Sequence, residues 1–534
     1  MDSLILSFPF FNIPFINVFL LEKRGLRIKS KHYLSPDSIS FLNFAAMAKT
    51  ATPAENGQLK DIISHAKEYG FVYPSSEIYD GLQAVYDYGA YGVELKNNLK
   101  RLWWETMTRV QDNIVGIDAS IFMHPITWKA SGHVDGFNDP MIDNKDSKKR
   151  YRADVLVEEH AAIFERAGDI EKANALTGAL ARMLEAEDLD GVRHLITNEG
   201  IKCPISGTSN WTDVRQFNLM FSTQVGSVAE DSTTIYLRPE TAQGIFVNFL
   251  NVQKTARMKV PFGIAQIGKA FRNEIVARQF IFRMREFEQM EMQFFVRPGT
   301  ELEWYKKWSD MRMKWHLALG TPAEKLRKHD HEKLAHYANA AMDIEYDFPF
   351  GFKEVEGIHS RTDFDLKAHQ EFSKKKQQYF DPEINQNYIP FVIETSIGAD
   401  RLFLLTLCNA YTEENTEEKS RTYLKLHPAI APVKAAILPI TKKDGLPEKA
   451  QELVELLKYD FNIIYEDAAS IGKRYARQDL IGTPFCIAVD HQTLEDNTVT
   501  IRHRDTTEQE RVAISEVHGR IAEATSFRRI FEKL

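Results

Sequence analysis

The 534-residue sequence predicts an α+β fold, in which an antiparallel sheet is flanked by helices and a separate C-terminal α/β domain follows. Three observations support this fold class. Apolar and polar residues alternate with the period of a strand in 262–275 and again in 285–296. Large apolar side chains recur at helical spacing in 93–110. After Pro432, apolar runs and a helical pattern alternate as β-α-β to the end of the chain.

Composition excludes several classes of protein. Hydrophobic residues make up 43% of the chain and charged residues 27%, which rules out a disordered or fibrous protein. The net charge of −8 argues against nucleic-acid binding through bulk positive charge, but leaves local basic patches open. Cys203, Cys408 and Cys486 are far apart and form no C-x-x-C pair, which excludes a disulfide scaffold and fits a reducing cytosol.

Residues 1–46 differ from the rest of the chain. The apolar run from Leu4 to Leu21 is interrupted by two prolines and two asparagines, and no basic cluster precedes it. From Met47 onward the composition becomes that of a cytosolic enzyme. We therefore expect 1–46 to be a disordered or non-native leader on a cytoplasmic protein with no membrane span. The basic, acid-free stretch 23–35 leaves organelle targeting as the alternative.

The patterns predict these elements in chain order: a helix over 93–110, an irregular stretch ending in the Lys/Arg/Asp-rich piece 143–154, inserted helices over 155–200, strands over 233–296, helices over 300–340, a strand-turn-helix over 388–410, an acidic linker at 412–419, and the α/β domain.

The chemistry concentrates on a predicted hairpin. Alternation places Gln266, Arg272 and Glu274 on one face of its first strand. In the return strand, one face is apolar and the other is polar. The apolar face carries Met290, Met292, Phe294 and Val296, and the polar face carries Arg285, Phe287, Gln289, Glu291 and Gln293. Together these groups offer arginines that can bind phosphate, an aromatic ring that can stack on a base, and acceptors for amino groups. The alternative is an antiparallel sheet with one solvated face.

A second polar segment runs from Glu394 to Arg401. Glu394 and Ser396 share a strand face, Gly398 turns the chain, and Arg401 then falls in the first turn of a helix. The helix dipole disfavours a cation there, and an anionic ligand would relieve this. The alternative is an ordinary capped helix with a surface arginine.

These segments resemble the signature motifs of class II aminoacyl-tRNA synthetases. Phe271–Glu274 followed by Arg285–Glu291 resembles motif 2, and Gly398–Arg401 with its helix resembles motif 3. The helix and strand of 94–126 resemble motif 1, the dimerisation element.

Other segments are similar to the homodimeric glycyl-tRNA synthetases in particular. They are Tyr151–Asp154, Arg238–Gly244 and Glu394–Gly398. Ile471–Tyr475 and Gly482–Pro484 resemble the anticodon-binding domain that several class II enzymes share.

The resemblance implies a domain organisation and a reaction. The catalytic domain, built on the class II antiparallel sheet, would span 47–154 and 201–425, with a helical insertion at 155–200 and an anticodon-binding domain at 426–534. The protein would be a homodimer that activates glycine with ATP to glycyl-adenylate and transfers glycine to the 3′ end of tRNA(Gly).

The resemblance also implies an ATP site with Arg272 and Arg401 as catalytic residues. Arg272 would hold the α-phosphate, Phe287 would stack on adenine and Glu274 would accept from its amino group. Arg401 would contact the distal phosphates or the other adenine face, and Glu354 would contact ATP and Mg²⁺. The full implied set is Arg272, Asn273, Glu274, Phe282, Arg283, Met284, Arg285, Glu286, Phe287, Glu354, Val355, Gly398, Ala399, Asp400 and Arg401.

Glycine recognition is implied for a second set, in which carboxylates suit an ammonium group and an arginine suits a carboxylate. Alanine would be rejected for lack of space, because glycine offers no side chain to hold. The implied set is Arg152, Glu240, Phe287, Glu288, Gln289, Met290, Glu291, Glu394, Thr395, Ser396, Ile397 and Gly398.

The C-terminal residues 431–534 carry 15 Lys and Arg against 17 Asp and Glu, so tRNA binding there must use local groups. Lys473, Arg474 and Arg477 form the expected phosphate patch, with a solvated helix start as the alternative. We expect no zinc: His329, His331 and His336 are interpreted as residues on a polar helix surface.

Two other functions stay open at this point. A synthetase of another specificity is disfavoured by the run Arg238–Gly244. A non-catalytic paralogue is disfavoured because Arg272 and Arg401 are both present.

Overall fold

The computed structural model describes residues 53–226, 233–275, 279–331, 334–335, 337–415 and 420–534. The leader expected at 1–46 lies outside these residues. Among the helices that are described, none is both long enough and apolar enough to cross a membrane.

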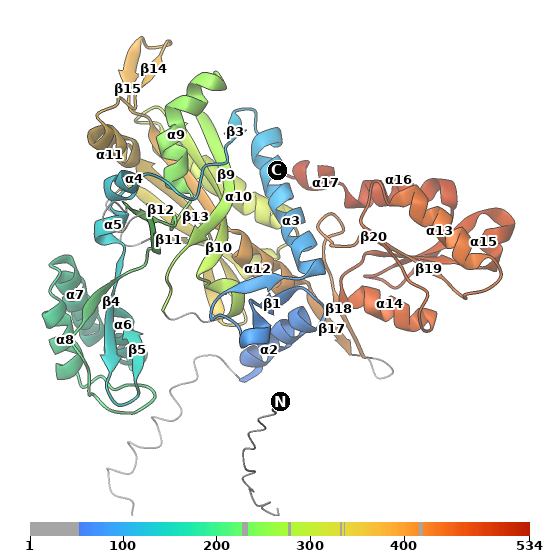
Figure 1. Cartoon of the computed structure of the whole chain (residues 1–534), viewed down its shortest axis with the longest axis horizontal. Helices are drawn as coiled ribbons and strands as arrows, with labels where there is room; N and C mark the ends of the chain where they lie inside the picture. The colour runs from blue at the N-terminus through green and yellow to red at the C-terminus, as the bar shows by residue number, and fades with distance from the viewer. Residues whose placement is uncertain (1–52, 227–232, 276–278, 332–333, 336, 416–419) are drawn as a thin grey trace, which may run out of the picture. The chain divides into compact units, whose positions relative to one another are not determined.

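A seven-stranded sheet forms the centre of the larger part of the chain, with strand order β11-β12-β13-β16-β10-β9-β3 (Figure 1). All neighbours pair antiparallel except β3 and β9, which are parallel. The strands are β3 (Ile114–Gly116), β9 (Phe262–Phe271), β10 (Glu286–Val296), β11 (Leu326–Asp330), β12 (Ala340–Phe348), β13 (Gly351–Thr362) and β16 (Phe391–Gly398).

The predicted hairpin is confirmed as β9 and β10, which pair from Phe271 opposite Glu286 to Phe262 opposite Phe295. The predicted faces are confirmed as well. Met290, Met292 and Phe294 are fully buried in the main hydrophobic core. The intervening polar residues of β10 therefore project from the opposite face of the sheet, because strand side chains alternate.

Helices cover both faces of this sheet. One face packs on α3 (Ala90–Glu105), α10 (Glu301–Ala318) and α12 (Ala399–Ala410), with Trp103 and Trp315 among the fully buried side chains. The other face packs on α9 (Ala242–Thr255) and α11 (Phe364–Ser373). Helix α3 runs into a π-helical turn at Thr106–Val110, so the predicted helix over 93–110 is confirmed. Further helices in the N-terminal part of the described chain are α2 (Pro53–Glu68), α4 (Pro125–Ala130) and α5 (His133–Gly136).

Several predicted elements are wrong. The stretch 233–296 contains helix α9 between its strands, and its buried residues Ala242, Ile245, Phe246 and Phe249 have helical spacing. The predicted helices over 300–340 end at Ala318, because Gly320 and Pro322 stop the helix and β11 begins at Leu326.

Two segments that were expected to be irregular form strands. The piece 143–154 belongs to the antiparallel pair β4 (Asn138–Asn144) and β5 (Lys149–Arg152). The acidic stretch begins as β17 (Tyr411–Asn415), which pairs with β18 (Ser420–Leu424) instead of forming a linker, while 416–419 lie outside the described residues. Charged side chains occupy exposed positions of β5 and β17, where they disguise the alternation, whereas β4 is largely buried.

The helical insertion expected over 155–200 is present as three helices, and they pack on a sheet of their own. They are α6 (Ala153–Arg166), α7 (Ile170–Glu185) and α8 (Leu189–Asn198), and the sheet has the order β5-β4-β6 with β6 at Arg215–Asn218. Ile142, Leu156 and Trp211 share one small core. This compact unit therefore draws residues from both sides of 155–200.

The C-terminal α/β domain has a five-stranded sheet of order β20-β19-β21-β22-β23. Its helices α13 and α16 pack on one face and α14 packs on the other. The strands are β19 (Ala435–Pro439), β20 (Ile463–Tyr465), β21 (Phe485–Val489), β22 (Thr498–His503) and β23 (Gln509–Ala513), and the helices are α13 (Leu446–Leu457), α14 (Ile471–Leu480), α15 (His491–Asp496), α16 (Ile514–Thr525) and α17 (Arg528–Phe531).

Three short antiparallel pairs complete the described chain. They are β1 (Val72–Pro74) with β2 (Tyr86–Tyr88), β7 (Ser222–Val225) with β8 (Thr233–Tyr236), and β14 (Tyr379–Asp381) with β15 (Gln386–Tyr388).

Candidate active site

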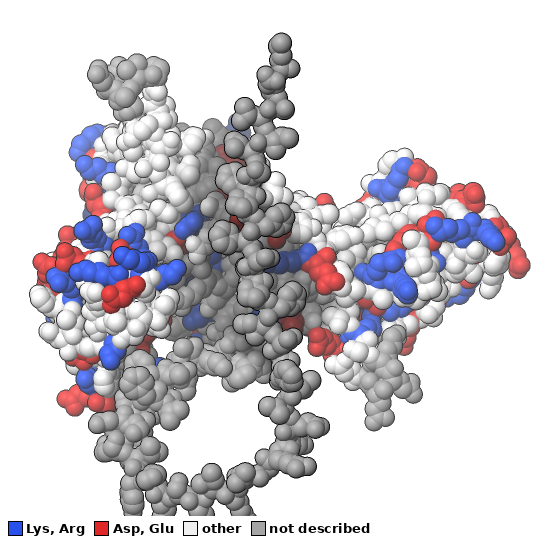
Figure 2. Space-filling view, turned by 60° about the horizontal axis from the view of Figure 1, so that its bottom comes forward, with Lys and Arg blue, Asp and Glu red and all other residues white. Residues whose placement is uncertain are grey.

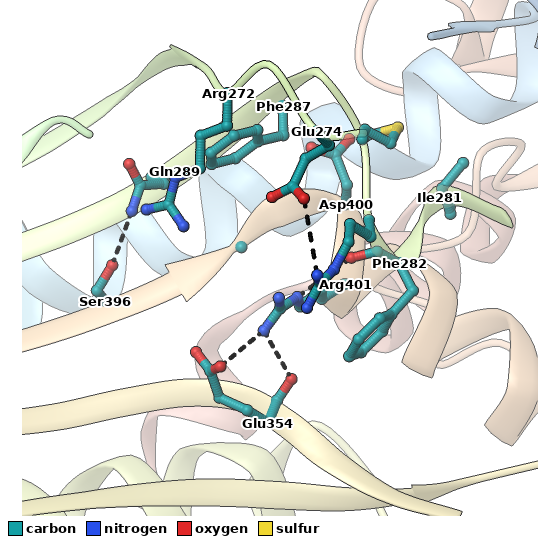
Figure 3. A pocket seen from close by; sticks show the side chains of 13 residues that line it. Arg272, Glu274, Ile281, Phe282, Phe287, Gln289, Glu354, Ser396, Asp400 and Arg401 are labelled. Atoms are coloured by element: carbon teal, nitrogen blue, oxygen red, sulfur yellow. Dashed lines mark hydrogen bonds and ion pairs between the residues drawn. The ribbon is translucent and has the colours of Figure 1, made fainter. Parts of the chain in front are cut away.

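A pocket lies where β10, β13 and β16 of the central sheet meet the start of α12 (Figure 3). Of the residues that line it, all except Ile281 belong to the sets that the sequence implied. They are Arg272, Glu274, Ile281, Phe282, Arg283, Met284, Phe287, Gln289, Glu354, Ser396, Gly398, Asp400 and Arg401.

Arg272 and Phe287 form one wall of the pocket. The guanidinium carbon of Arg272 lies 5.3 Å from the centre of the Phe287 ring. Its Nε donates to the carbonyl oxygen of Pro239 at 3.1 Å, which holds the side chain in place. Among the described residues, this is the one hydrogen bond that the structure shows for the Arg272 side chain, so its terminal nitrogens can face a ligand.

Arg401 and Phe282 form the facing wall. The guanidinium carbon of Arg401 lies 4.4 Å from the centre of the Phe282 ring, and its Nη1 lies 3.0 Å from the Glu354 carboxylate. Arg401 is the third residue of α12, in the first helical turn as predicted. The Arg401 guanidinium holds the pKa of Glu354 below its usual value. An anionic ligand would compete with Glu354 for the same cation.

Other residues of the implied ATP set contribute backbone or packing. The Arg285 side chain donates to the backbone oxygens of Glu274 and Gln83, at 3.0 and 3.2 Å, and so fastens the loop behind the pocket. Glu286 pairs with Lys269 at the surface. Val355 and Ala399 are buried in the main core, and the backbone nitrogen of Asn273 donates to Leu219. The carboxylate of Glu274 itself faces Arg283 at 3.6 Å.

Asp400 and Glu288 make a buried ion cluster with Lys96 of α3. The Nζ of Lys96 lies 2.6 Å from Asp400 and 2.8 Å from Glu288, and Asp400 also accepts from the backbone nitrogen of Glu288 at 2.8 Å. Burial works against the charge on Lys96, yet the two carboxylates raise its pKa. The cluster joins the three segments that resemble motifs 1, 2 and 3, so these carboxylates position the site.

Next to the pocket lies a group of three carboxylates, Glu240, Glu291 and Glu394. Glu394 accepts from Gln293 at 2.7 Å and from Arg361 at 2.9 Å, and Gln293 also donates to Glu291 at 2.7 Å. Burial, together with the charges of Glu394 and Glu240, raises the pKa of Glu291 well above its usual value. Burial alone would also raise the pKa of Glu394, but Arg361 and a nearby histidine hold it low.

Gln289 and Ser396 connect this carboxylate group to the pocket. The Gln289 amide donates to the Ser396 hydroxyl at 3.3 Å and accepts from the backbone nitrogen of Thr241 at 3.2 Å. Thr241 in turn donates from its hydroxyl to Glu291. Three residues of the implied glycine set point away from this face, because strand side chains alternate: Met290, Thr395 and Ile397.

Arg152 lies apart from the carboxylate group. It ends β5, where it pairs with Asp139 at 3.1 Å and Asp154 at 2.6 Å. The arginine that contacts Glu394 is Arg361, which sequence reasoning missed. No local pattern singles it out, because its contact with Glu394 depends on β13 pairing with β16, where Arg361 also forms a buried ion pair of 2.9 Å with Asp365.

The expected phosphate patch in α14 divides into two kinds of side chain. Lys473 and Arg477 are exposed, and Arg477 pairs with Glu466. Arg474 is buried and donates to the backbone oxygens of Pro439 and Glu466, at 2.7 and 3.0 Å. Figure 2 shows basic and acidic side chains intermingled on the visible face of this domain, so any tRNA contact there depends on local groups.

The largely antiparallel sheet carries Arg272 on the β9–β10 hairpin, and its strand β16 leads into the helix with Arg401 in the first turn; this is the arrangement that the resemblance to class II aminoacyl-tRNA synthetases implied. Residues 223–410 match the family described as tRNA synthetase class II core domain (G, H, P, S and T). Residues 434–524 match the anticodon binding domain, and 139–175 with 165–219 match glycyl-tRNA synthetase insertion domain 1.

Curated relatives narrow the class to one specificity. The chain is 56% identical to a glycine–tRNA ligase of Chlorobaculum tepidum over 459 residues, which cover 86% of this chain and 98% of the relative. It is 53% identical to those of Macrococcus caseolyticus and Staphylococcus haemolyticus, over 88% of this chain and 99% of each relative. The chain belongs to the glycine–tRNA ligase family, and the resemblance that the motifs indicated is confirmed.

Proposed function

We propose that the pocket and the adjoining carboxylate group are where glycine is activated by ATP and passed to the 3′ end of tRNA(Gly). The observation that carries this proposal is the junction made by Gln289 and Ser396. This junction lies between the three carboxylates, which would suit an ammonium group, and a pocket walled by two arginines and two phenylalanines. The α-phosphate and the glycine carboxylate would meet at this junction.

For ATP, we propose that adenine stacks on Phe287 and that Glu274 accepts from its amino group. Arg272 would neutralise charge at the α-phosphate, and Arg401 would hold the distal phosphates or cover adenine. Phosphoryl-transfer chemistry of this kind depends on alignment and charge stabilisation more than on a general base. The contacts of Arg272 with Pro239 and Phe287 support its role, because they hold the guanidinium in place before ATP arrives.

For glycine, we propose that Glu240, Glu291 and Glu394 surround the ammonium group. Gln293 holds Glu291 and Glu394 by hydrogen bonds, and Gln243 holds Glu240, so the group is rigid, and alanine would be rejected if its methyl group overfilled the space between them. Arg152 stays the candidate for the glycine carboxylate, as the resemblance implied, and its ion pairs with Asp154 and Asp139 would hold the guanidinium in place. Arg361 acts behind Glu394 and positions it.

Mg²⁺ is the proposed companion of ATP. The residues present fit it, because Glu354 offers a partly exposed carboxylate in the pocket wall and Mg²⁺ prefers oxygen ligands. When bound, the ion would neutralise phosphate charge. Glu354 would hold it, and Arg401 would then turn from Glu354 toward the phosphates.

We also propose a cytoplasmic homodimer. In the segment that resembles motif 1, Phe122 is 56% exposed to solvent and Ile126 is 48% exposed. Exposed apolar side chains of this kind favour a protein–protein interface. Cys203, Cys408 and Cys486 are all free thiols, which fits a reducing compartment. Light scattering during size exclusion would measure twice the chain mass for a dimer, and the chain mass itself would contradict it.

Pyrophosphate exchange with each of the twenty amino acids tests the proposed site. Exchange should depend on glycine, and Glu394→Gln should reduce it at least tenfold. Glu383→Gln is the control, because Glu383 is exposed and pairs with Arg297 at 3.2 Å, outside both implied sets. Equal loss in both variants, or normal exchange in a folded Glu394→Gln protein, would contradict the assignment of the carboxylate group.

A further inference from the structure

Two histidines and an aspartate come together at the edge of the central sheet, outside the pocket. The ligand atoms of His331, Asp343 and His359 all lie within 4.8 Å of one another. The expectation that His331 lies on a polar helix is wrong, because β11 replaces the helix there. His329 is a strand residue too, and His336 lies outside the described residues.

Strand register explains the cluster. Ala341 of β12 lies opposite His359 of β13, and Asp343 lies opposite Gly357, so Asp343 and His359 are diagonal neighbours on one face. His331 follows β11, and its backbone nitrogen donates to the Ala341 oxygen at 3.0 Å, which continues the pairing of β11 with β12. The pairing of three successive strands thus brings the three side chains together.

The three side chains bring two imidazole nitrogens and a carboxylate oxygen close together. The Nε2 of His331 lies 2.9 Å from Asp343, and the two imidazole centres are 5.7 Å apart. The Nδ1 of His359 bonds to Glu394 at 2.8 Å, which leaves its Nε2 for the cluster. A carboxylate on the far nitrogen is the usual way in which proteins orient a metal-binding histidine.

Gly357 keeps the space between these ligands open. A Cβ at this position would lie 3.1 Å from the Cε1 of His359 and 3.5 Å from Asp343. The site is also accessible, because the side chains of His331 and Asp343 are 32% and 16% exposed and that of His359 is 19% exposed. An ion could therefore enter, and water could complete its coordination.

We infer that His331, Asp343 and His359 bind one divalent transition-metal ion, with zinc as the metal of best fit. Two imidazoles and one carboxylate suit zinc, whereas Mg²⁺ prefers oxygen ligands alone, so this site differs from the one proposed at Glu354. Tetrahedral zinc at about 2.0–2.1 Å from each ligand needs donor atoms about 3.3 Å apart, which small side-chain rotations reach from the observed arrangement. This inference departs from the sequence-based expectation of no zinc.

The site connects to the carboxylate group through one residue. A metal on Nε2 of His359 fixes the proton on Nδ1, and that proton is donated to Glu394. The bound ion therefore steadies a carboxylate that we assign to glycine, and this consequence rests on the proposed function. The binding itself does not, so the experiment measures metal first.

The full chain is stripped with a chelator, incubated with excess zinc sulfate and dialysed, and the zinc content per chain is measured. The wild type should retain about one ion per chain. His331→Ala and Asp343→Asn should each retain less than a fifth of it. The control is His329→Ala, which removes a histidine paired with Glu345 at 3.2 Å in the same strand pair and should retain the full amount.

Cobalt provides a second readout. Cobalt-loaded wild type should show the visible absorption of a tetrahedral site, and His331→Ala, with an unchanged circular dichroism spectrum, should lack it. A wild type that retains no zinc, or a His331→Ala protein that retains as much as wild type, would overturn the inference. Because no substrate is present in either measurement, such a failure leaves the proposed activation of glycine untouched.

Discussion

Single side chains decide the chemistry here, and strand alternation predicted which of them share a face. Gln289, Glu291 and Ser396 project together because the period of two is a property of any strand. Arg361 and His359 were missed, because their role depends on β13 lying beside β16, which no local pattern encodes. Arg474 matches a family motif and was expected in a phosphate patch, but its side chain is buried against backbone carbonyls.

Arg272→Ala should nearly abolish adenylate formation while the protein stays folded. A lost charge contact at the reacting phosphate typically costs about 3–4 kcal/mol, or a few hundred-fold in rate. Glycine-dependent pyrophosphate exchange measures it. Lys269→Ala is the control on the same hairpin, since Lys269 pairs with Glu286 in solvent and should stay near wild type. Near-normal exchange in the folded Arg272→Ala protein would remove this residue from the mechanism.

Glycine binding should release protons when the pH lies below the raised pKa of Glu291. Burial raises that pKa, so in this range the free protein holds a proton on Glu291, and an entering ammonium group lowers the pKa again. Affinity for glycine should therefore rise with pH until the free Glu291 is ionised. Calorimetry in buffers of different ionisation enthalpy counts the protons, and Glu291→Gln should release none. Proton uptake by the wild type would contradict this reading.

At the scale of elements, long strongly periodic segments were predictable and short charged ones were not. The hairpin of β9 and β10 and the helix α3 follow directly from apolar spacing. Strand β11 was taken for helix because four of its five residues are charged or histidine and exposed, so its sequence has no alternation to detect. Contacts between elements could not be predicted from local patterns either, because Lys96 meets Glu288 and Asp400 only when the chain is folded.

Lys96→Ala should destabilise the protein strongly. It leaves Asp400 and Glu288 buried without their cation, and removing one partner of such a pair typically costs about 3–5 kcal/mol. Urea unfolding monitored by tryptophan fluorescence would measure the loss. Arg109→Ala breaks an exposed pair with Glu105 that follows the same helix, and should change stability by about 0.5 kcal/mol or less. Equal effects of the two substitutions would show that the buried cluster adds nothing.

At the scale of the whole molecule, the C-terminal domain is fastened to the rest by specific contacts. Ile530 of α17 is fully buried in the main core, and the Asn98 side chain of α3 donates to the backbone oxygens of Ile430 and Ala431. Arg421 of β18 pairs with Asp479 at 3.0 Å. An α/β domain after Pro432 was predictable from the β-α-β pattern, but these contacts were not, because they join residues far apart in sequence.

Two neighbouring residues of α14 should separate tRNA binding from folding. Lys473→Ala should raise the KM for tRNA, lower the salt dependence of binding by about one counterion, and leave pyrophosphate exchange unchanged. Arg474→Ala should instead lower the melting temperature, because buried carbonyls lose their donor. Filter binding at several salt concentrations and thermal melting make the comparison. A Lys473→Ala protein with normal tRNA binding would show that the exposed patch is only a solvated helix start.

A crystal structure of this chain with a non-hydrolysable glycyl-adenylate analogue tests the central claim most directly. We predict the adenine ring against Phe287, the phosphate mimic on Arg272 and the ammonium group among Glu240, Glu291 and Glu394. An analogue bound with its ammonium group away from these carboxylates, or outside the pocket between Arg272 and Arg401, would contradict the account.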